Sequence, residues 1–267
     1  MLHAGLKTIR WSEFRERENM PSLLRIAVAL WALAQAPHAR AEELSRKSVW
    51  DLALGEALAA QPAPQEFRAY ACGSKGGAPR QKLESFAGFA RCPAEPNGLH
   101  EVYFEYDDEL EFIARAHDLD REINRWAGTS EYGYPVVASA LFDAQGLLRG
   151  VRVATDPRAE QRAEVTDADR RKRESFYAFG SIMASRFDIE PARDCSSPGP
   201  ADGESPVGEQ FVKLDCDRSD AAAKRRYTLK VRLLRKPGQS GRDPRTPAQL
   251  TSGQFESSAM LEIFSAP

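Results

Sequence analysis

The sequence predicts an exported α+β protein in which antiparallel sheet packs against two or three amphipathic helices and is held together by disulfide bonds. Three observations carry this prediction. They are a leader-like segment over residues 20–41, four cysteines that all follow it, and an alternation of strand-like and helix-like segments along the rest of the chain. Export takes the cysteines out of the reducing cytosol, which favours disulfide pairing.

Residues 20–41 have the order of parts typical of a secretory signal peptide. Arg25 provides a basic start, an apolar run extends from residue 26 to 36, and the small-x-small sequence Ala39-Arg40-Ala41 follows. This order predicts cleavage after Ala41 and a periplasmic or secreted protein. The apolar run is too short for a stable membrane anchor, and there is no cysteine at the cleavage site to carry a lipid.

Residues 1–19 lie upstream of a signal that is complete without them. Two explanations stay open: a start codon assigned too early, with translation from Met20, or a long cytoplasmic extension. The completeness of the signal favours the first. Residues 42–267 then form the exported α+β domain. Its halves, 42–156 and 157–267, each hold one cysteine pair and a helix placed near strands, a pattern compatible with two lobes.

The charge balance argues against nucleic acid as a partner. The chain of 267 residues has 37 Lys and Arg residues against 39 Asp and Glu residues, a formal net charge of −2. The leader is more basic than acidic, so the exported part is more acidic still, and an acidic chain is poorly suited to general nucleic-acid binding. Nothing after Ala41 reaches the length of a membrane span, so no transmembrane span is expected in the mature chain.

The four cysteines, Cys72, Cys92, Cys195 and Cys216, allow three disulfide pairings. Pairing in sequence order is the simplest, because each pair then flanks its own segment rich in glycine and proline. Each bridge would stabilise the fold by about 3 kcal/mol by restricting the unfolded chain. A zinc site is disfavoured, since the spacing Cys-x2-Cys is absent and histidines are few. No metal or cofactor is therefore expected.

Hydrophobic periodicity predicts the elements of the first half of the exported part. The strand expected over 100–106 should place Val102 and Phe104 on one face and Tyr103 on the other. In the hairpin expected over 135–156, the second strand should bring Leu147, Val151 and Val153 to one face and point Arg152 away from that face. The expected elements are a helix over 44–60, strands over 66–72 and 100–106, a helix from 107 to Gly128, and a hairpin over 135–156 with its turn at 143–146.

The second half is expected to contain one long helix and three strands. The helix should begin near Thr166, carry the basic block 170–173 on a solvated face, and bury Phe176, Phe179, Met183 and Phe187 at helical spacing. A loop rich in proline and glycine follows over 191–208. The strands are expected over 210–216, 226–234 and 255–264, with a polar loop at 236–247.

The order of helix, prolines and strands with a local cysteine pair over residues 44–106 resembles two groups of small exported helix-plus-sheet modules. These are the β-lactamase-inhibitor-protein-like proteins and the outer-membrane assembly lipoproteins. The resemblance rests on the order of elements and carries over no residue-level motif. It implies an α+β fold and says nothing of function. The chain departs from the lipoprotein branch in lacking a cysteine to anchor a lipid.

Candidate catalytic groups are few. Six acidic residues fall between Glu101 and Glu111, but strand alternation and the favourable electrostatics of a helix start explain them better than calcium binding or acid–base chemistry. His117, flanked by Asp118 and Asp120, is the best general-base candidate. No serine or cysteine nucleophile can be matched to it from the sequence. An exported hydrolase using His117 with neighbouring carboxylates is therefore the second functional hypothesis, and no catalytic residue is assigned.

The first hypothesis is a non-enzymatic protein that binds an envelope protein or an anionic envelope surface through a basic sheet face. From Lys224 to Arg245 there are nine basic residues and one acidic residue. The strand over 226–234 should turn its apolar residues inward and its basic residues outward. The outward face is equally well explained as a solvated surface. The candidate binding residues are Arg226, Lys230, Arg232 and Arg235.

Overall fold

The computed structural model describes residues 47–107, 113, 116–119, 129–156, 175–239 and 255–266. The chain divides into two units, Met1–Ser45 and Arg46–Pro267, and every described residue belongs to the second. Four expectations lie wholly or largely outside the described residues: the leader over 20–41 with the segment before it, the helix start near Thr166 with the basic block 170–173, most of the helix expected over 107–128, and most of the polar loop expected over 236–247.

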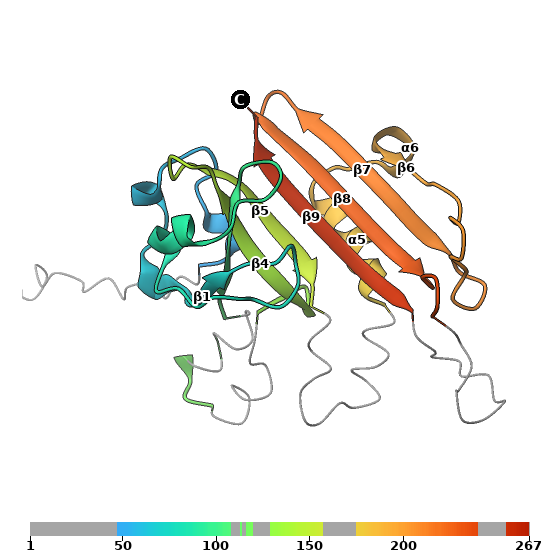
Figure 1. Cartoon of the computed structure of the whole chain (residues 1–267), viewed down its shortest axis with the longest axis horizontal. Coiled ribbons are helices and arrows are strands. Elements are labelled where there is room, and N and C mark those ends of the chain that lie inside the picture. The colour runs from blue at the N-terminus through green and yellow to red at the C-terminus, as the bar shows by residue number, and fades with distance from the viewer. Residues whose placement is uncertain are drawn as a thin grey trace, which may run out of the picture. The chain divides into compact units, whose positions relative to one another are not determined.

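A single antiparallel sheet contains all the strands of the described residues (Figure 1). Its order is β1-β2-β4-β5-β9-β8-β7-β6, and the short β3 pairs with β4. The last strand, β9, is inserted between β5 and β8 and so joins strands from both halves of the chain. The strands are β1 Arg68–Cys72, β2 His100–Glu105, β3 Ser130–Glu131, β4 Tyr134–Phe142, β5 Leu148–Thr155, β6 Cys195–Ser196, β7 Val212–Asp220, β8 Arg225–Leu234 and β9 Glu256–Ser265.

The balance of secondary structure corrects the expected fold class toward β. Among the described residues the helices are short, apart from α5. The antiparallel sheet and the disulfides are confirmed, whereas the term α+β holds only loosely. The helical elements are α5 Phe176–Arg186, α6 Pro191–Asp194 and the 3-10 turns η2 Val49–Asp51, η3 Leu58–Ala60, η4 Pro64–Glu66 and η5 Phe86–Arg91.

Helix α5 covers one face of the sheet over β8 and β9, as Figure 1 shows. Phe176, Phe179 and Met183 of α5 are buried, as their helical spacing predicted, whereas Phe187 follows the end of the helix and is half-buried. Gly180 lies so close to β8 that a Cβ atom there would come within 2.4 Å of Val231. The inner face of β8 supplies Leu229 and Val231, which confirms the predicted alternation along this strand.

Aromatic rings make up much of the core that the described residues form on the first half of the sheet. Phe104 of β2 lies 4.8 Å from Phe67 and 5.2 Å from Phe86, measured between ring centroids. Phe142 of β4 lies 5.6 Å from Phe86. Phe86 is carried on the six-residue turn η5, and its contacts with the rings of β2 and β4 pack this part of the core.

The helix expected over 44–60 is wrong for its described part, which is η2, a turn and η3. Gly55 has a φ of 88°, in the left-handed region that an α-helix does not use. The backbone there bonds to the β4–β5 hairpin instead: the Gly55 N–H donates to the Leu148 carbonyl at 2.7 Å. Contacts to the sheet thus override the helical spacing of the apolar residues.

The hairpin over 135–156 is confirmed, with one change of register. A bulge pairs Leu141 with Gly150 but Phe142 with Leu148. The bulge turns Leu148, rather than the predicted Leu147, into the core, where it is fully buried. The three late strands are confirmed close to their predicted positions.

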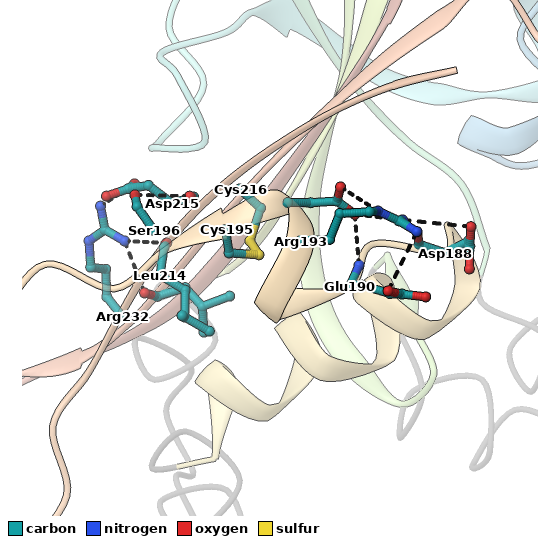
Figure 2. The surroundings of a disulfide bond; sticks show 11 residues. Asp188, Glu190, Arg193, Cys195, Ser196, Leu214, Asp215, Cys216 and Arg232 are labelled. Carbon is teal, nitrogen blue, oxygen red and sulfur yellow. Dashed lines mark hydrogen bonds and ion pairs between the residues drawn. A yellow bond between two sulfur atoms is a disulfide. The ribbon is translucent and has the colours of Figure 1, made fainter. Parts of the chain in front are cut away.

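Both disulfides pair in sequence order, as predicted: Cys72 with Cys92 and Cys195 with Cys216. The first is buried at the end of β1, and the second lies directly across β6 and β7, where Cys195 and Cys216 are register partners (Figure 2). Within the described part of the chain, no helix has both the length and the apolar character needed to cross a membrane.

Candidate functional site

The side chains of β7 and β8 that point away from α5 form a surface that we call the outer sheet face. Strand alternation places Lys213, Asp215, Asp217 and Ser219 on it from β7, and Arg226, Thr228, Lys230 and Arg232 from β8. The inner side chains of β8 are buried, whereas Arg226 and Lys230 are exposed. Three of the four predicted binding residues therefore lie on one surface, and Arg235 follows the end of β8.

Carboxylates of β7 neutralise two of the predicted basic residues. The Arg226 side chain donates to both oxygens of Asp217, with Nε to Oδ1 at 2.8 Å. The side-chain hydrogen bond and the charge of Arg226 hold the pKa of Asp217 below its usual value. Arg232 donates to Asp215 at 2.6 Å and to the Leu214 carbonyl at 2.7 Å, as Figure 2 shows. Lys213 of the same face pairs with Glu204 at 2.8 Å, so three of the four basic residues are neutralised and the outer sheet face is only weakly basic.

Lys230 is different from its neighbours on β8. It is exposed, and within the described residues it makes neither a hydrogen bond nor an ion pair. Its register partners are Asp215 of β7 and Met260 of β9. Arg235 is half-buried and donates to the Pro206 carbonyl at 3.2 Å, so it anchors the loop after β6. Of the four candidates, Lys230 is the cation available to a partner.

Sequence reasoning missed the neutralising aspartates. The signal was present in the alternation of β7, since Asp215 and Asp217 fall on the same face of the β7–β8 hairpin as the arginines of β8. Charged side chains on neighbouring strands of one face pair readily. Reading the two strands together, rather than one at a time, would have predicted these ion pairs.

His117 is exposed, and its backbone N–H donates to the Ile113 carbonyl at 3.2 Å, as in a helical turn. None of the described side chains is hydrogen-bonded to its ring. Asp118 is exposed as well, whereas Asp120 lies outside the described residues. Among the described residues there is no group of three or more His, Cys, Asp or Glu residues suited to hold a metal ion.

A buried ion cluster, also missed from the sequence, lies between β2, β5 and β9. Its centre is Arg152 of β5, which is 1% exposed. Arg152 Nη1 is 2.7 Å from Glu95 Oε1 and 2.9 Å from Glu101 Oε2. Arg152 Nε donates to Glu262 Oε1 at 2.8 Å. One guanidinium therefore serves three carboxylates and has its donors fully used.

Further bonds fix the carboxylates of this cluster. Glu262 accepts a hydrogen bond from the Thr228 hydroxyl at 3.1 Å, and Glu101 accepts one from the Lys75 backbone N–H at 2.6 Å. Gly73 lies against Glu101, where a Cβ atom would come within 2.3 Å of the carboxyl carbon. The loop after β1 thus closes over the cluster only because residue 73 is a glycine.

Electrostatics in the cluster favour a structural role. Burial alone would raise the pKa of Glu95, but the hydrogen bonds and the charge of Arg152 outweigh burial and hold that pKa below its usual value of 4.5. The Arg152 guanidinium is kept protonated by the same carboxylates. A guanidinium with every donor occupied offers nothing to a substrate, so the arrangement is suited to tying segments together rather than to chemistry.

Comparison of the chain with protein-family models, with curated proteins and with solved structures gives no match.

Proposed function

We propose that the protein is a non-enzymatic binding protein of the periplasm or the extracellular space that contacts a partner protein through the outer sheet face. The observation that carries the proposal is the asymmetry of β7 and β8. Their inner side chains pack against the core under α5, whereas Arg226, Asp217 and Lys230 on the other side are exposed. Two disulfides support the compartment, since such bonds persist where the surroundings are oxidising.

The charge pattern favours a protein over an anionic surface as the partner. Arg226 and Arg232 already hold carboxylates of β7, so the face has little positive charge to offer a membrane or a polyanionic polymer. A protein surface can match alternating charges and place one carboxylate against Lys230. Electrostatic matching of this kind gives specificity and steers association.

The proposal is tested by cross-linking from the face itself. A photoreactive amino acid replaces Lys230 in one variant and Lys82 in another, both expressed with export. Lys82 is a matched control because it is also exposed and lies beside β1, at the opposite edge of the sheet. We expect one protein to be cross-linked from position 230 and not from position 82.

The cross-linked protein is then purified and its affinity measured. Lys230→Glu should weaken binding by about tenfold or more, because it replaces an attraction with a repulsion. Lys82→Glu should leave the affinity unchanged. Equal cross-linking from both positions, or an affinity unaffected by Lys230→Glu, would refute the proposal. Binding of anionic phospholipid vesicles that depends on Lys230 would overturn the protein partner in favour of an anionic surface.

A further inference from the structure

A second cluster, the Arg186 stack, lies at the C-terminal end of α5, on the side of the sheet that this helix covers. Arg186 and Tyr132 are exposed, and Trp50 and Phe187 are half-buried. The guanidinium carbon of Arg186 lies 4.5 Å from the ring centroid of Trp50, 5.5 Å from that of Phe187 and 5.7 Å from that of Tyr132. The Trp50 and Phe187 rings are themselves in contact, with centroids 5.4 Å apart. Cations gain stability over aromatic faces, so the rings fix the guanidinium in place.

Tyr132 takes part in the stack from an unfavourable backbone conformation. It occupies the two-residue turn between β3 and β4 together with Gly133, with φ values of 51° and 72°. Turns of this kind prefer Asn, Asp or Gly, because a bulky side chain is strained at positive φ. The Tyr132 ring is nevertheless 52% exposed, and its hydroxyl accepts a hydrogen bond from Arg186 Nη1. The turn therefore places an aromatic ring at the surface beside an arginine, at the cost of backbone strain.

Among the described residues Arg186 has no carboxylate within 4 Å. Arg80, Arg91, Arg225 and Arg235 share this property, but of these five arginines Arg186 is the one that lies against aromatic rings. Arg152, Arg193, Arg218, Arg226 and Arg232 each lie within 4 Å of a carboxylate. Arg186 is exposed, and within the described residues its only hydrogen bond is to Tyr132. Its one hydrogen bond uses Nη1, so most of the N–H groups of its guanidinium are left for an acceptor. A planar guanidinium with free N–H groups is suited to bind both oxygens of a carboxylate.

The geometry points to the Arg186 stack as a docking site for an acidic segment of a partner protein. A carboxylate of the partner pairs with Arg186, and an adjacent apolar or aromatic side chain packs on Trp50 and Tyr132. Arginine, tryptophan and tyrosine are the residue types that most often dominate the binding energy of protein interfaces. A helix C-terminus does favour a basic residue, but that effect explains neither the three rings gathered around Arg186 nor the strained, exposed Tyr132.

The test is a titration followed by nuclear magnetic resonance on the exported, oxidised protein. The probe is an acidic peptide, acetyl-Gly-Glu-Glu-Glu-Phe-Gly-amide, and the control probe has glutamine in place of each glutamate. We expect the acidic peptide to shift the Trp50 indole N–H and the Arg186 Nε–H signals in a saturable manner. Arg186→Gln should weaken that binding by about tenfold or more, because it removes a charge-assisted pair.

Three further variants make the result decisive. Arg193→Gln removes an exposed arginine that is already paired with Asp194, so it should leave peptide binding unchanged. Arg186→Lys keeps the charge but loses the planar fork, so its affinity should fall between those of the wild type and Arg186→Gln. Lys230→Glu should not alter the Trp50 shifts, which separates this site from the outer sheet face.

Several outcomes would overturn the inference. They are equal binding of the glutamine peptide and the acidic peptide, an unchanged affinity in Arg186→Gln while the spectrum stays folded, and a Trp50 signal that does not respond at saturation. Binding of phosphatidylglycerol vesicles that requires Arg186, without binding of the acidic peptide, would assign the site to a lipid headgroup instead.

Discussion

Arg152 ties together three segments that are distant in the sequence. It pairs with Glu95 in the loop before β2, Glu101 in β2 and Glu262 in β9. Burying a charge is costly unless it is paired and hydrogen-bonded, and here the pairing is complete for the guanidinium. The strand alternation correctly predicted that Arg152 points away from the apolar core. It gave no sign of the three partners, which come from separate parts of the chain.

Replacing Arg152 should be far more damaging than replacing an exposed arginine. In Arg152→Met the side chain fits, but three carboxylates are left without their cation in a buried place. We expect a loss of about 3–5 kcal/mol in the free energy of unfolding, measured by urea denaturation. Arg226→Gln breaks only the exposed pair with Asp217 and should cost less than about 1 kcal/mol. A similar cost for the two variants would show that the buried cluster does not stabilise the fold.

At the scale of elements, the short strand β6 protects the edge of the sheet. Open strand edges invite pairing with other chains. The Cys195–Cys216 disulfide fixes β6 across the middle of β7, and the Ser196 hydroxyl donates to the Asp215 carbonyl at 3.3 Å (Figure 2). A two-residue strand would hold weakly without the covalent link, so we infer that this disulfide keeps the edge covered.

The contact between α5 and β8 depends on one glycine. In Gly180→Ala the new methyl group would lie 2.4 Å from a methyl group of Val231, so the helix must shift away from the sheet. Overpacking of this kind costs about 1–3 kcal/mol, which outweighs the better helix propensity of alanine. Thermal and urea unfolding would measure the change. Gly199→Ala is the control, since nothing lies within 4 Å of a Cβ atom there; equal stability of the two variants would contradict the tight contact.

For the whole molecule, stability should fall steeply in acid. Ion pairs and hydrogen bonds lower the pKa of several carboxyl groups below their usual values of 3.8 for Asp and 4.5 for Glu, and Asp194, hydrogen-bonded to Arg193, reaches about 2. Groups with a lowered pKa in the folded state stabilise it above the usual value, and that contribution is lost as the pH falls through the folded value. The loss should therefore occur between about pH 4.5 and pH 2.

The measurement is the free energy of unfolding against pH, in low and in high salt. Salt should screen the exposed pairs, such as Arg226–Asp217, much more than the pair of Glu95 with the buried Arg152. Glu95→Gln should accordingly reduce the acid dependence that persists in high salt. An unchanged dependence in that variant would show that Glu95 is not shielded from solvent in the folded protein.

Local patterns were enough to predict much of this protein. Alternation located the strands of both halves, spacing located the buried residues of α5, and the positions of the cysteines gave both disulfides, because each of these properties depends on residues near one another in the chain. The same kind of pattern failed at 47–60, where the apolar residues have helical spacing but the backbone bonds to a distant hairpin.

Only the tertiary structure decided what the charged and aromatic residues do. The insertion of β9 between β5 and β8 brings Glu262 to Arg152, and the meeting of a tight turn, a helix end and an N-terminal segment brings Tyr132, Arg186 and Trp50 together. Sequence alone could not pair them, because such contacts depend on which strands become neighbours. That choice reflects the packing of the whole sheet rather than the preference of any one segment.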